Sequence, residues 1–172
     1  PELPETVDIV PLFGGLSRTD QDAAIRPAPP GRRKVVLATS IAESSLTLDD
    51  IRIVVDAGFM RVPSFSPRTG MGSLETILVT QASADQRRGR AGRVAPGVCY
   101  RMWPEGSHAG LKPFSAPEIL AADLAPLVLE LAAWGVTDAA AMAWLDPPPE
   151  AAVAQARDTL TGLEAIDAAG RI

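Results

Sequence analysis

Four arginines, a glutamine and two glycines fall within residues 86–93, QRRGRAGR. Guanidinium groups keep their charge and donate paired hydrogen bonds, so this density of positive charge fits a polyanion such as a triphosphate. Ser83 followed three residues later by Gln86 is typical of a capping box, which predicts a helix that begins at Ser83. On that helix Gln86, Arg90 and Arg93 share one face, where they suit the stabilisation of a γ-phosphate during transfer.

A plainer interpretation of this run is the solvated basic face of a helix, and it stays open. Gly89 and Gly92 weaken it, because each glycine costs a helix about 1 kcal/mol relative to alanine. That cost needs a reason, such as close approach of the backbone to a phosphate or to a packed strand. We expect Arg87 and Arg88 to be structural, pairing with a carboxylate or packing on a sheet. For Gln86, a capping role alone also stays open.

The composition fits a globular protein of one domain, or of one domain with a smaller companion: 172 residues, 47% hydrophobic and 22% charged. The net charge of -5 argues against a general nucleic-acid coat. Residues 1–109 carry 13 basic and 12 acidic side chains and residues 110–172 carry 3 and 9, so charge that binds an anion must be local. The single cysteine, Cys99, fits a reducing cytoplasm, and no apolar run approaches the roughly 20 residues that span a bilayer. We expect a soluble, cytoplasmic protein with no membrane partner.

Apolar runs bounded by turn residues predict strands at residues 6–13, 34–39, 51–56, 74–80 and 97–102. Ser17 predicts the N-cap of a helix that runs to about Ile25. Strands rich in valine and isoleucine and separated by helical segments are typical of a mostly parallel sheet covered on both faces. The prolines and glycines of residues 59–80 predict a hairpin or a long irregular connection.

From Ser115 onward the pattern becomes helical. One apolar stripe predicts a core-facing helix bent at Pro126 and ended by Gly135: Leu120, Leu124, Leu127, Val128, Leu131 and Trp134. Helices are also predicted at 137–145 and 150–161, followed by a strand, a turn at 167–170 and the start of another strand. Three helices and a hairpin are typical of a winged-helix domain. His108 has no cysteine or second histidine near it, so we expect an exposed linker residue and no metal site.

Two runs carry a resemblance to a known family. Residues 86–93 are similar to the last motif, Q-R-x-G-R-A-G-R, of DEAH-box superfamily 2 ATP-dependent helicases, and residues 39–49, TSIAESSLTLD, resemble the fifth motif, T-N-I-A-E-T-S-L-T-I-D. The likeness runs through almost the whole chain and is closest to the bacterial HrpB type, in which a serine stands where Ser40 stands here. It implies an α/β fold: a RecA-like (P-loop NTPase type) second helicase domain at 1–109, incomplete at its N-terminus, and a winged-helix domain at 110–172, incomplete at its C-terminus.

The resemblance also implies roles for the residues around the arginines. Arg90 and Arg93 would be arginine fingers that reach the β- and γ-phosphates of ATP, and Gln86 would help to orient the attacking water. Thr39 and Ser40 would hold the backbone of a nucleic acid, as would Gly15 and Ser17 in the position of the fourth motif.

Three further residues would contact the nucleotide. Thr47 and Asp49 would face it, with Asp49 toward the ribose, and Ile25 stands where many members place an aromatic residue that stacks on adenine. Asp50 departs from the family, which usually has glycine there. A plain cluster of helix-capping residues remains an alternative interpretation of the fifth motif.

The chain contains neither G-x-x-x-x-G-K-[S/T] nor D-E-x-H, which family members carry on a preceding RecA-like domain. We therefore expect a fragment, inactive alone, of a helicase that couples ATP hydrolysis to translocation on single-stranded RNA or DNA, with Mg²⁺ held mainly by that upstream domain. The alternative is a non-catalytic nucleic-acid-binding or interaction module that keeps the helicase fold. A DNA-repair or restriction ATPase of the same superfamily is a third possibility, against which the stretch IAESSLT speaks.

Overall fold

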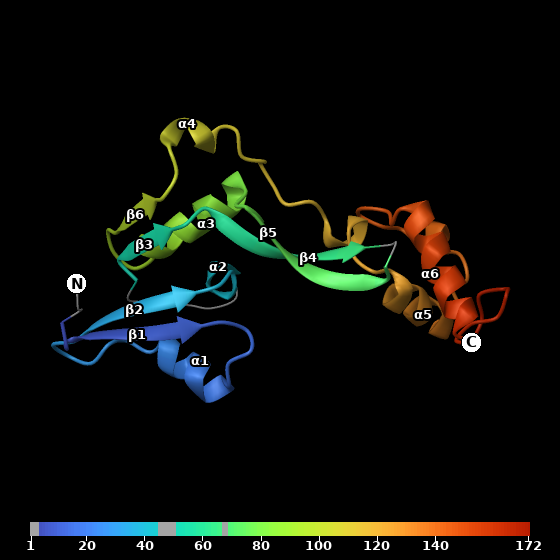
Figure 1. Ribbon diagram of the computed structural model, residues 1–172, viewed down its shortest axis with the longest axis horizontal. Coiled ribbons are helices and arrows are strands. Elements are labelled where there is room, and N and C mark those ends of the chain that lie inside the picture. Colours follow the sequence, from blue (N-terminus) through green and yellow to red (C-terminus); the bar gives the residue numbers. More distant parts are fainter. Residues whose placement is uncertain (1–3, 45–50, 67–68) are drawn as a thin grey trace. The chain divides into compact units, whose positions relative to one another are not determined.

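The computed structural model describes residues 4–44, 51–66 and 69–172 (Figure 1). Its contacts divide the chain into two compact units, each described by itself below. The first unit comprises Pro1–Arg61 and Thr76–Phe114, and the second comprises Val62–Glu75 and Ser115–Ile172.

The first unit begins with a β-α-β arrangement. Strands β1 (Val7–Leu12) and β2 (Arg33–Ala38) pair in parallel, with Leu12 opposite Ala38 at their carboxyl ends, and helix α1 (Arg18–Ile25) connects them. Leu12 and Ala24 are fully buried between the strand pair and the helix. The predicted strands and the predicted helix are confirmed here.

Both ends of α1 are satisfied by nearby side chains. The Ser17 hydroxyl accepts the backbone N–H of Asp20 at 3.2 Å, which is the predicted N-cap. At the other end, the Lys34 ammonium donates to the carbonyl of Ala24 at 2.6 Å and also to that of Arg26. A cation at this position complements the partial negative charge of the last helical carbonyls.

A second parallel pair joins β3 (Ile53–Asp56) to β6 (Val98–Arg101), and helix α3 (Gln81–Ala91) packs against β3. The helix begins two residues before the predicted start. Its N-cap is Thr80, whose buried hydroxyl accepts the N–H of Ser83 at 3.2 Å. The predicted capping box of Ser83 and Gln86 is therefore wrong, because Thr80 supplies the capping oxygen first.

The strands form three separate pairs, β1–β2, β3–β6 and β4–β5, and not one continuous sheet. Alternate apolar side chains of the second pair are exposed: Ile53, Val55, Val98 and Tyr100. The prediction of parallel strands is confirmed, but a sheet covered on both faces is not found among the described residues. The valine-rich pattern indicates that both faces of such strands tend to be buried. No element of the described chain covers this face of the β3–β6 pair.

Strands β4 (Phe59–Ser66) and β5 (Met71–Leu78) pair as a hairpin, which agrees with one of the two predicted alternatives (Figure 1). Just before β4, Gly58 has a φ of 81°, and a Cβ there would lie 2.8 Å from the ring of Trp103. Glycine is required at this turn for both reasons. Two short helices complete the first unit, α2 (Ile41–Ser44) and α4 (Glu105–His108).

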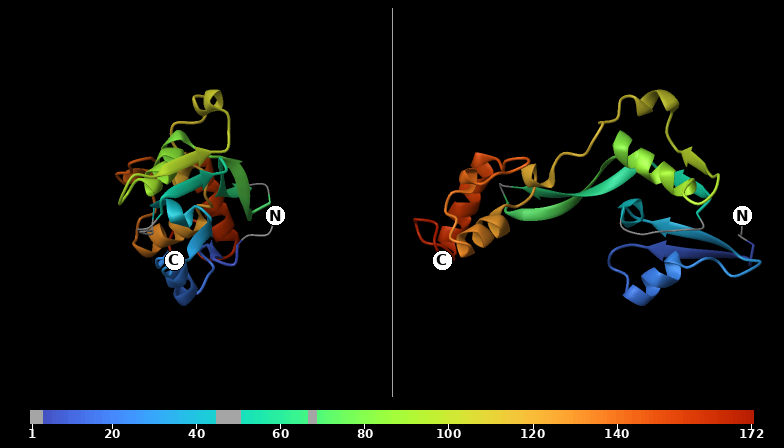
Figure 2. Two further views of the ribbon diagram at one scale, coloured as in Figure 1. Left: turned by 90° about the vertical axis from the view of Figure 1, so that its left-hand side faces the viewer. Right: turned by 180° about the vertical axis from the view of Figure 1, so that it is seen from behind.

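In the second unit, α5 (Ala125–Ala133) and α6 (Glu150–Gly162) pack side by side (Figures 1 and 2). Two 3₁₀ turns, η1 (Glu118–Leu120) and η2 (Ala139–Ala141), precede them in turn. The core of this unit consists of buried apolar side chains from both helices and the segments beside them: Leu124, Val128, Ala132, Ala156, Leu160 and Ile166.

Helix α5 differs from its prediction at its start and in the place of Trp134. Pro126 lies in the first turn, where its missing N–H costs nothing, so it starts the helix and does not bend it. Gly135 ends the helix as predicted, with a φ of 81°, and the N–H of Val136 returns to the carbonyl of Leu131 at 2.8 Å. Trp134 is 71% exposed, so its predicted place in the core is wrong.

The helix predicted at 137–145 is wrong, because only the 3₁₀ turn η2 forms there. Asp138 caps that turn, and the indole of Trp144 donates to the carbonyl of Ala139 at 2.7 Å, which holds the following segment folded back. Helix α6 matches its prediction. After it, Asp167 and Arg171 close the predicted turn, but residues 163–172 form no strand.

Candidate functional site

Helix α3 carries the arginine run, and Arg87 is its most engaged side chain. Its Nε donates to a carboxylate oxygen of Glu43 at 3.1 Å, and its Nη1 donates to Asp56 at 2.8 Å and to the carbonyl of Phe59 at 3.1 Å. The side chains of Arg87, Glu43 and Asp56 are 16%, 18% and 1% exposed. The structural, carboxylate-paired role expected of Arg87 is confirmed.

Asp56 is the buried anchor of this group. One carboxylate oxygen accepts both Arg87 and the N–H of Gly58, the latter at 3.0 Å, while the other has no hydrogen-bond partner among the described residues. A carboxylate in such a place needs a nearby cation, because burial of an unpaired charge is costly. Arg87 is that cation.

Arg90 binds the backbone of α2, the short helix that contains Glu43. Its Nε donates to the carbonyl of Glu43 at 3.1 Å, and its Nη2 donates to the same oxygen. Glu43 thus accepts Arg87 with its side chain and Arg90 with its main chain, which brings the segments 39–44 and 86–93 into direct contact.

Arg93 lies two residues beyond the end of α3, with Gly92 as the C-cap. The predicted single helical face shared by Gln86, Arg90 and Arg93 is therefore wrong at its third member, because the helix ends before Arg93. Gln86 and Arg93 are both exposed. A Cβ at Gly89 or at Gly92 would meet no atom within 4 Å, so packing within the described chain does not require either glycine.

The loops after β1 and β2 meet at one edge of the first unit. The N–H of Thr39 donates to the carbonyl of Leu12 at 3.0 Å, so the segment with Thr39 and Ser40 starts beside the end of β1. Gly15 and Ser17 follow β1 and lead into α1, and all four predicted residues are exposed. The hydroxyl of Ser17 is already used as the helix cap and also donates to Asp20 at 2.7 Å.

The structure does not bring Ile25 to that edge. Ile25 ends α1 and packs against the buried cluster of Leu12 and Ala24, close to the start of β2, where Lys34 binds the last carbonyls of the helix. Thr47 and Asp49 lie outside the described residues.

Comparisons with known proteins agree with this arrangement. Residues 2–95 match the family described as the helicase conserved C-terminal domain. The chain belongs to this family. Among similar proteins, the ATP-dependent RNA helicase HrpB of Escherichia coli K12 is 48% identical over 159 residues, which are 92% of this chain and 20% of that protein. The pre-mRNA-splicing factor ATP-dependent RNA helicase prp22 of Schizosaccharomyces pombe is 43% identical over 169 residues, 98% of this chain and 14% of that protein.

Two solved structures are similar over 99% of the chain at 46% identity. They are titled as crystal structures of the E. coli DExH-box NTPase HrpB, with a TM-score of 0.85, and of the Escherichia coli DEAH/RHA helicase HrpB, with a TM-score of 0.91. This chain covers 21% and 22% of them. Together these likenesses identify it as the C-terminal domain region of a DEAH-box helicase with an α/β, RecA-like fold, spanning about a fifth of the length of its HrpB relatives.

This helicase domain contains a second polar cluster that the sequence did not indicate. Arg101 donates to Asp85 at 2.6 Å, lies 5.7 Å from the ring of Trp103 and approaches both ring nitrogens of His108 at 3.4 and 3.3 Å. The Arg101 hydrogen bond holds the pKa of Asp85 below its usual range. His108 stacks on Trp103 and is half-buried, so its predicted role as an exposed linker residue is wrong.

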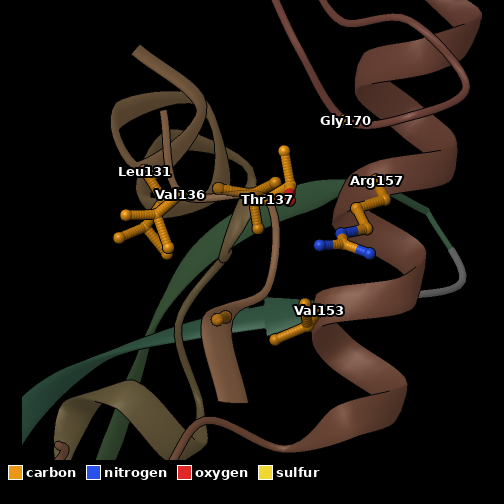
Figure 3. Close-up of a pocket in the computed structure, with 8 residues that line it drawn as sticks. Leu131, Val136, Thr137, Val153, Arg157 and Gly170 are labelled. Carbon is orange, nitrogen blue, oxygen red and sulfur yellow. The ribbon is translucent and has the colours of Figure 1, made fainter. Parts of the chain in front are cut away.

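Two further features lie outside these polar clusters. Burial raises the pKa of the Cys99 thiol, which fits the expected packing role. In the second unit, α5, η2 and α6 line a small pocket with Val128, Leu131, Val153 and Arg157 (Figure 3). Within the described ranges, no group of three or more metal-ligating side chains occurs, and no helix is long and apolar enough to cross a membrane.

Proposed function

We propose that this chain is the part of an ATP-dependent RNA helicase that binds single-stranded nucleic acid and completes the ATP site. The observation that carries the proposal is the contact of Glu43 with Arg87 and Arg90, which joins the segment of the fifth motif to the helix of the last motif. RNA is favoured over DNA because the relatives are named as RNA helicases.

On the nucleotide side, Arg90 and Arg93 act as arginine fingers that stabilise the charge developing on the transferred phosphate, and Gln86 orients the attacking water. Exposed Arg93 and the open space beside Gly89 and Gly92 support this assignment, because they leave room for phosphates to approach the backbone. Thr47 and Asp49 contact the nucleotide by resemblance. Ile25, half-buried at the end of α1, takes the place of the adenine-stacking aromatic by resemblance.

Mg²⁺ is needed to bridge phosphate oxygens during hydrolysis. The described residues offer no cluster of ligands for it, so the proposal assigns Mg²⁺ binding and the phosphate loop to a preceding RecA-like domain of the same protein. The chain on its own is then inactive.

On the nucleic-acid side, Thr39 and Ser40 bind the phosphate backbone of the single-stranded nucleic acid, together with the loop of Gly15 and Ser17. These residues are exposed at the carboxyl ends of β1 and β2, where ligands of open α/β sheets bind. Contact with the backbone alone suits translocation, since it does not depend on base sequence.

We assign residues 1–109 to the second RecA-like domain and 110–172 to part of a winged-helix domain. The packed helices α5 and α6 and the turn at Asp167 support the latter. A cytoplasmic location belongs to the same proposal and is supported by the single cysteine. A non-catalytic binding module is not favoured, because Arg90 and Arg93 are both retained and the relatives are helicases.

The test is ATP hydrolysis by the full-length protein, with and without single-stranded RNA and then single-stranded DNA, in wild type, Arg93→Ala and the control Arg88→Ala. Arg88 is a suitable control because it is exposed and, among the described residues, its ion pair is a 3.7 Å contact with Asp85. We expect RNA-stimulated turnover in wild type and in the control, and a loss of about three orders of magnitude in kcat for Arg93→Ala. Turnover that survives Arg93→Ala in a folded protein would refute the finger role.

A further inference from the structure

We propose that Glu43 is a positioning residue. It fixes the guanidinium of Arg90 and links it to the segment of Thr39 and Ser40, which binds nucleic acid in the proposed function. This inference rests on the proposed function, in which Arg90 serves the nucleotide and Ser40 serves the strand. It assigns Glu43 a role in ATP turnover that acts through Arg90 and requires no contact of its own with either ligand.

The first step is the main-chain contact. Nε and Nη2 of Arg90 both donate to the carbonyl oxygen of Glu43, so one edge of the guanidinium is held and its plane is defined. This carbonyl belongs to α2, which packs against α3. The orientation of the Arg90 guanidinium therefore depends on where the carbonyl of Glu43 lies.

The second step is what holds that carbonyl in place. The carboxylate of Glu43 accepts Nε of Arg87, and the same guanidinium binds Asp56 at the end of β3. Arg87 and Arg90 are three residues apart on α3, so they share a face and reach Glu43 together. Because Asp56 is almost fully buried at the end of β3, the group Asp56–Arg87–Glu43 is attached to the buried part of the unit.

The third step connects Glu43 to Ser40, which binds nucleic acid in the proposed function. The N–H of Glu43 donates to the carbonyl of Ser40 at 2.9 Å, within the same short turn. A shift of Ser40 on binding a nucleic-acid backbone is therefore passed to Glu43 and, through its carbonyl, to Arg90. The carboxylate on Arg87 limits that shift, so its loss should affect both the rate of hydrolysis and its response to RNA.

A purely structural ion pair would stabilise the fold without acting on Arg90, and double-mutant analysis separates the two roles. The variants are Glu43→Ala, Arg90→Ala and their combination in the full-length protein, with Glu43→Gln as a second variant that keeps the side-chain length. Glu105→Gln is a matched control, because Glu105 is exposed at the start of α4.

The readouts are kcat and KM for ATP at saturating single-stranded RNA, the RNA concentration that gives half-maximal stimulation, and the thermal midpoint. We expect Glu43→Ala and Glu43→Gln to lower kcat about tenfold and to raise that RNA concentration, with little change in KM. In the Arg90→Ala background, Glu43→Ala should lower kcat no further. Glu105→Gln should behave as wild type.

Independent, multiplicative losses in the double variant would overturn the inference, as would Glu43 variants with a lowered thermal midpoint but unchanged kcat and unchanged RNA response. If Glu43→Ala does not fold, the same cycle with Glu43→Gln decides. One outcome would refute this inference and leave the proposed function standing. In it, RNA stimulates the wild-type protein and Arg93→Ala abolishes turnover, but the effects of the Glu43 and Arg90 substitutions are independent. Wild type without RNA-stimulated turnover refutes the proposed function itself.

Discussion

Arg87→Ala should destabilise the chain far more than the same change at the neighbouring Arg88. The substitution at Arg87 removes the hydrogen bonds to Glu43, Asp56 and the carbonyl of Phe59, and it leaves the Asp56 carboxylate, 1% exposed, without a cation. Removing one partner of a buried ion pair costs about 3–5 kcal/mol. Because Arg87 is itself 16% exposed, the lower end, about 3 kcal/mol, applies.

Arg88 provides the matched comparison on the same helix. It is 63% exposed and pairs with Asp85 at 3.7 Å, so Arg88→Ala should change the free energy of unfolding by no more than about 0.5 kcal/mol. For a chain of this length each 1 kcal/mol shifts the thermal midpoint by about 2–4 °C. Arg87→Ala should therefore lower the midpoint by about 6–12 °C, and Arg88→Ala by about 2 °C at most.

Thermal and urea unfolding of the 172-residue chain, followed by far-ultraviolet circular dichroism at one protein concentration, measures both effects. Equal midpoints for the two variants would refute the reasoning. The double variant Arg87→Ala with Asp56→Asn tests the cause, because it neutralises the carboxylate left behind and should recover part of the loss. A double variant no more stable than Arg87→Ala would show that the unpaired charge is not the source of the cost.

Three further substitutions test other parts of the first unit. Gly97→Ala would place a Cβ 1.9 Å from the carbonyl oxygen of Ala91, a backbone clash that should cost about 1–3 kcal/mol or more. Gly89→Ala, with no atom within 4 Å, should keep or raise stability, so equal urea midpoints for these two variants would contradict the close approach. Because Arg101 lowers the pKa of Asp85 in the folded state, this carboxylate adds stability above its unfolded pKa of about 3.9, and that stability is lost as the pH falls through the lower folded pKa. Asp85→Asn should thus reduce stability near pH 7 and converge with wild type in acid, whereas a constant difference at every pH would contradict the Arg101 effect.

Local signals predicted the first β-α-β segment well. Ser17 is followed by Asp20 and a short helical run, and two valine-rich strands flank it, so capping and apolar pattern point to the same answer. The helix expected at 137–145 failed for the opposite reason. Its alanines favour a helix, but Asp138 caps a single turn and Trp144 folds back onto Ala139, and such a contact has no signature in composition.

The candidate site was predictable in its residue types but not in its connections. The run at 86–93 and the segment at 39–49 were both found by their motifs, and Arg87 was expected to pair with a carboxylate. Its partners Glu43 and Asp56 lie 44 and 31 residues away in the sequence. No periodicity links such distant positions, because only the packing of α3 against α2 and β3 brings them together.

The bare face of the β3–β6 pair has a consequence for work with this chain alone. Ile53, Val55, Val98 and Tyr100 present an apolar surface to water, and such surfaces attract copies of the same molecule. Self-association of the folded form raises apparent stability by mass action. Melting temperatures of two variants are therefore comparable only at equal protein concentration, and a dilution series belongs beside every such measurement.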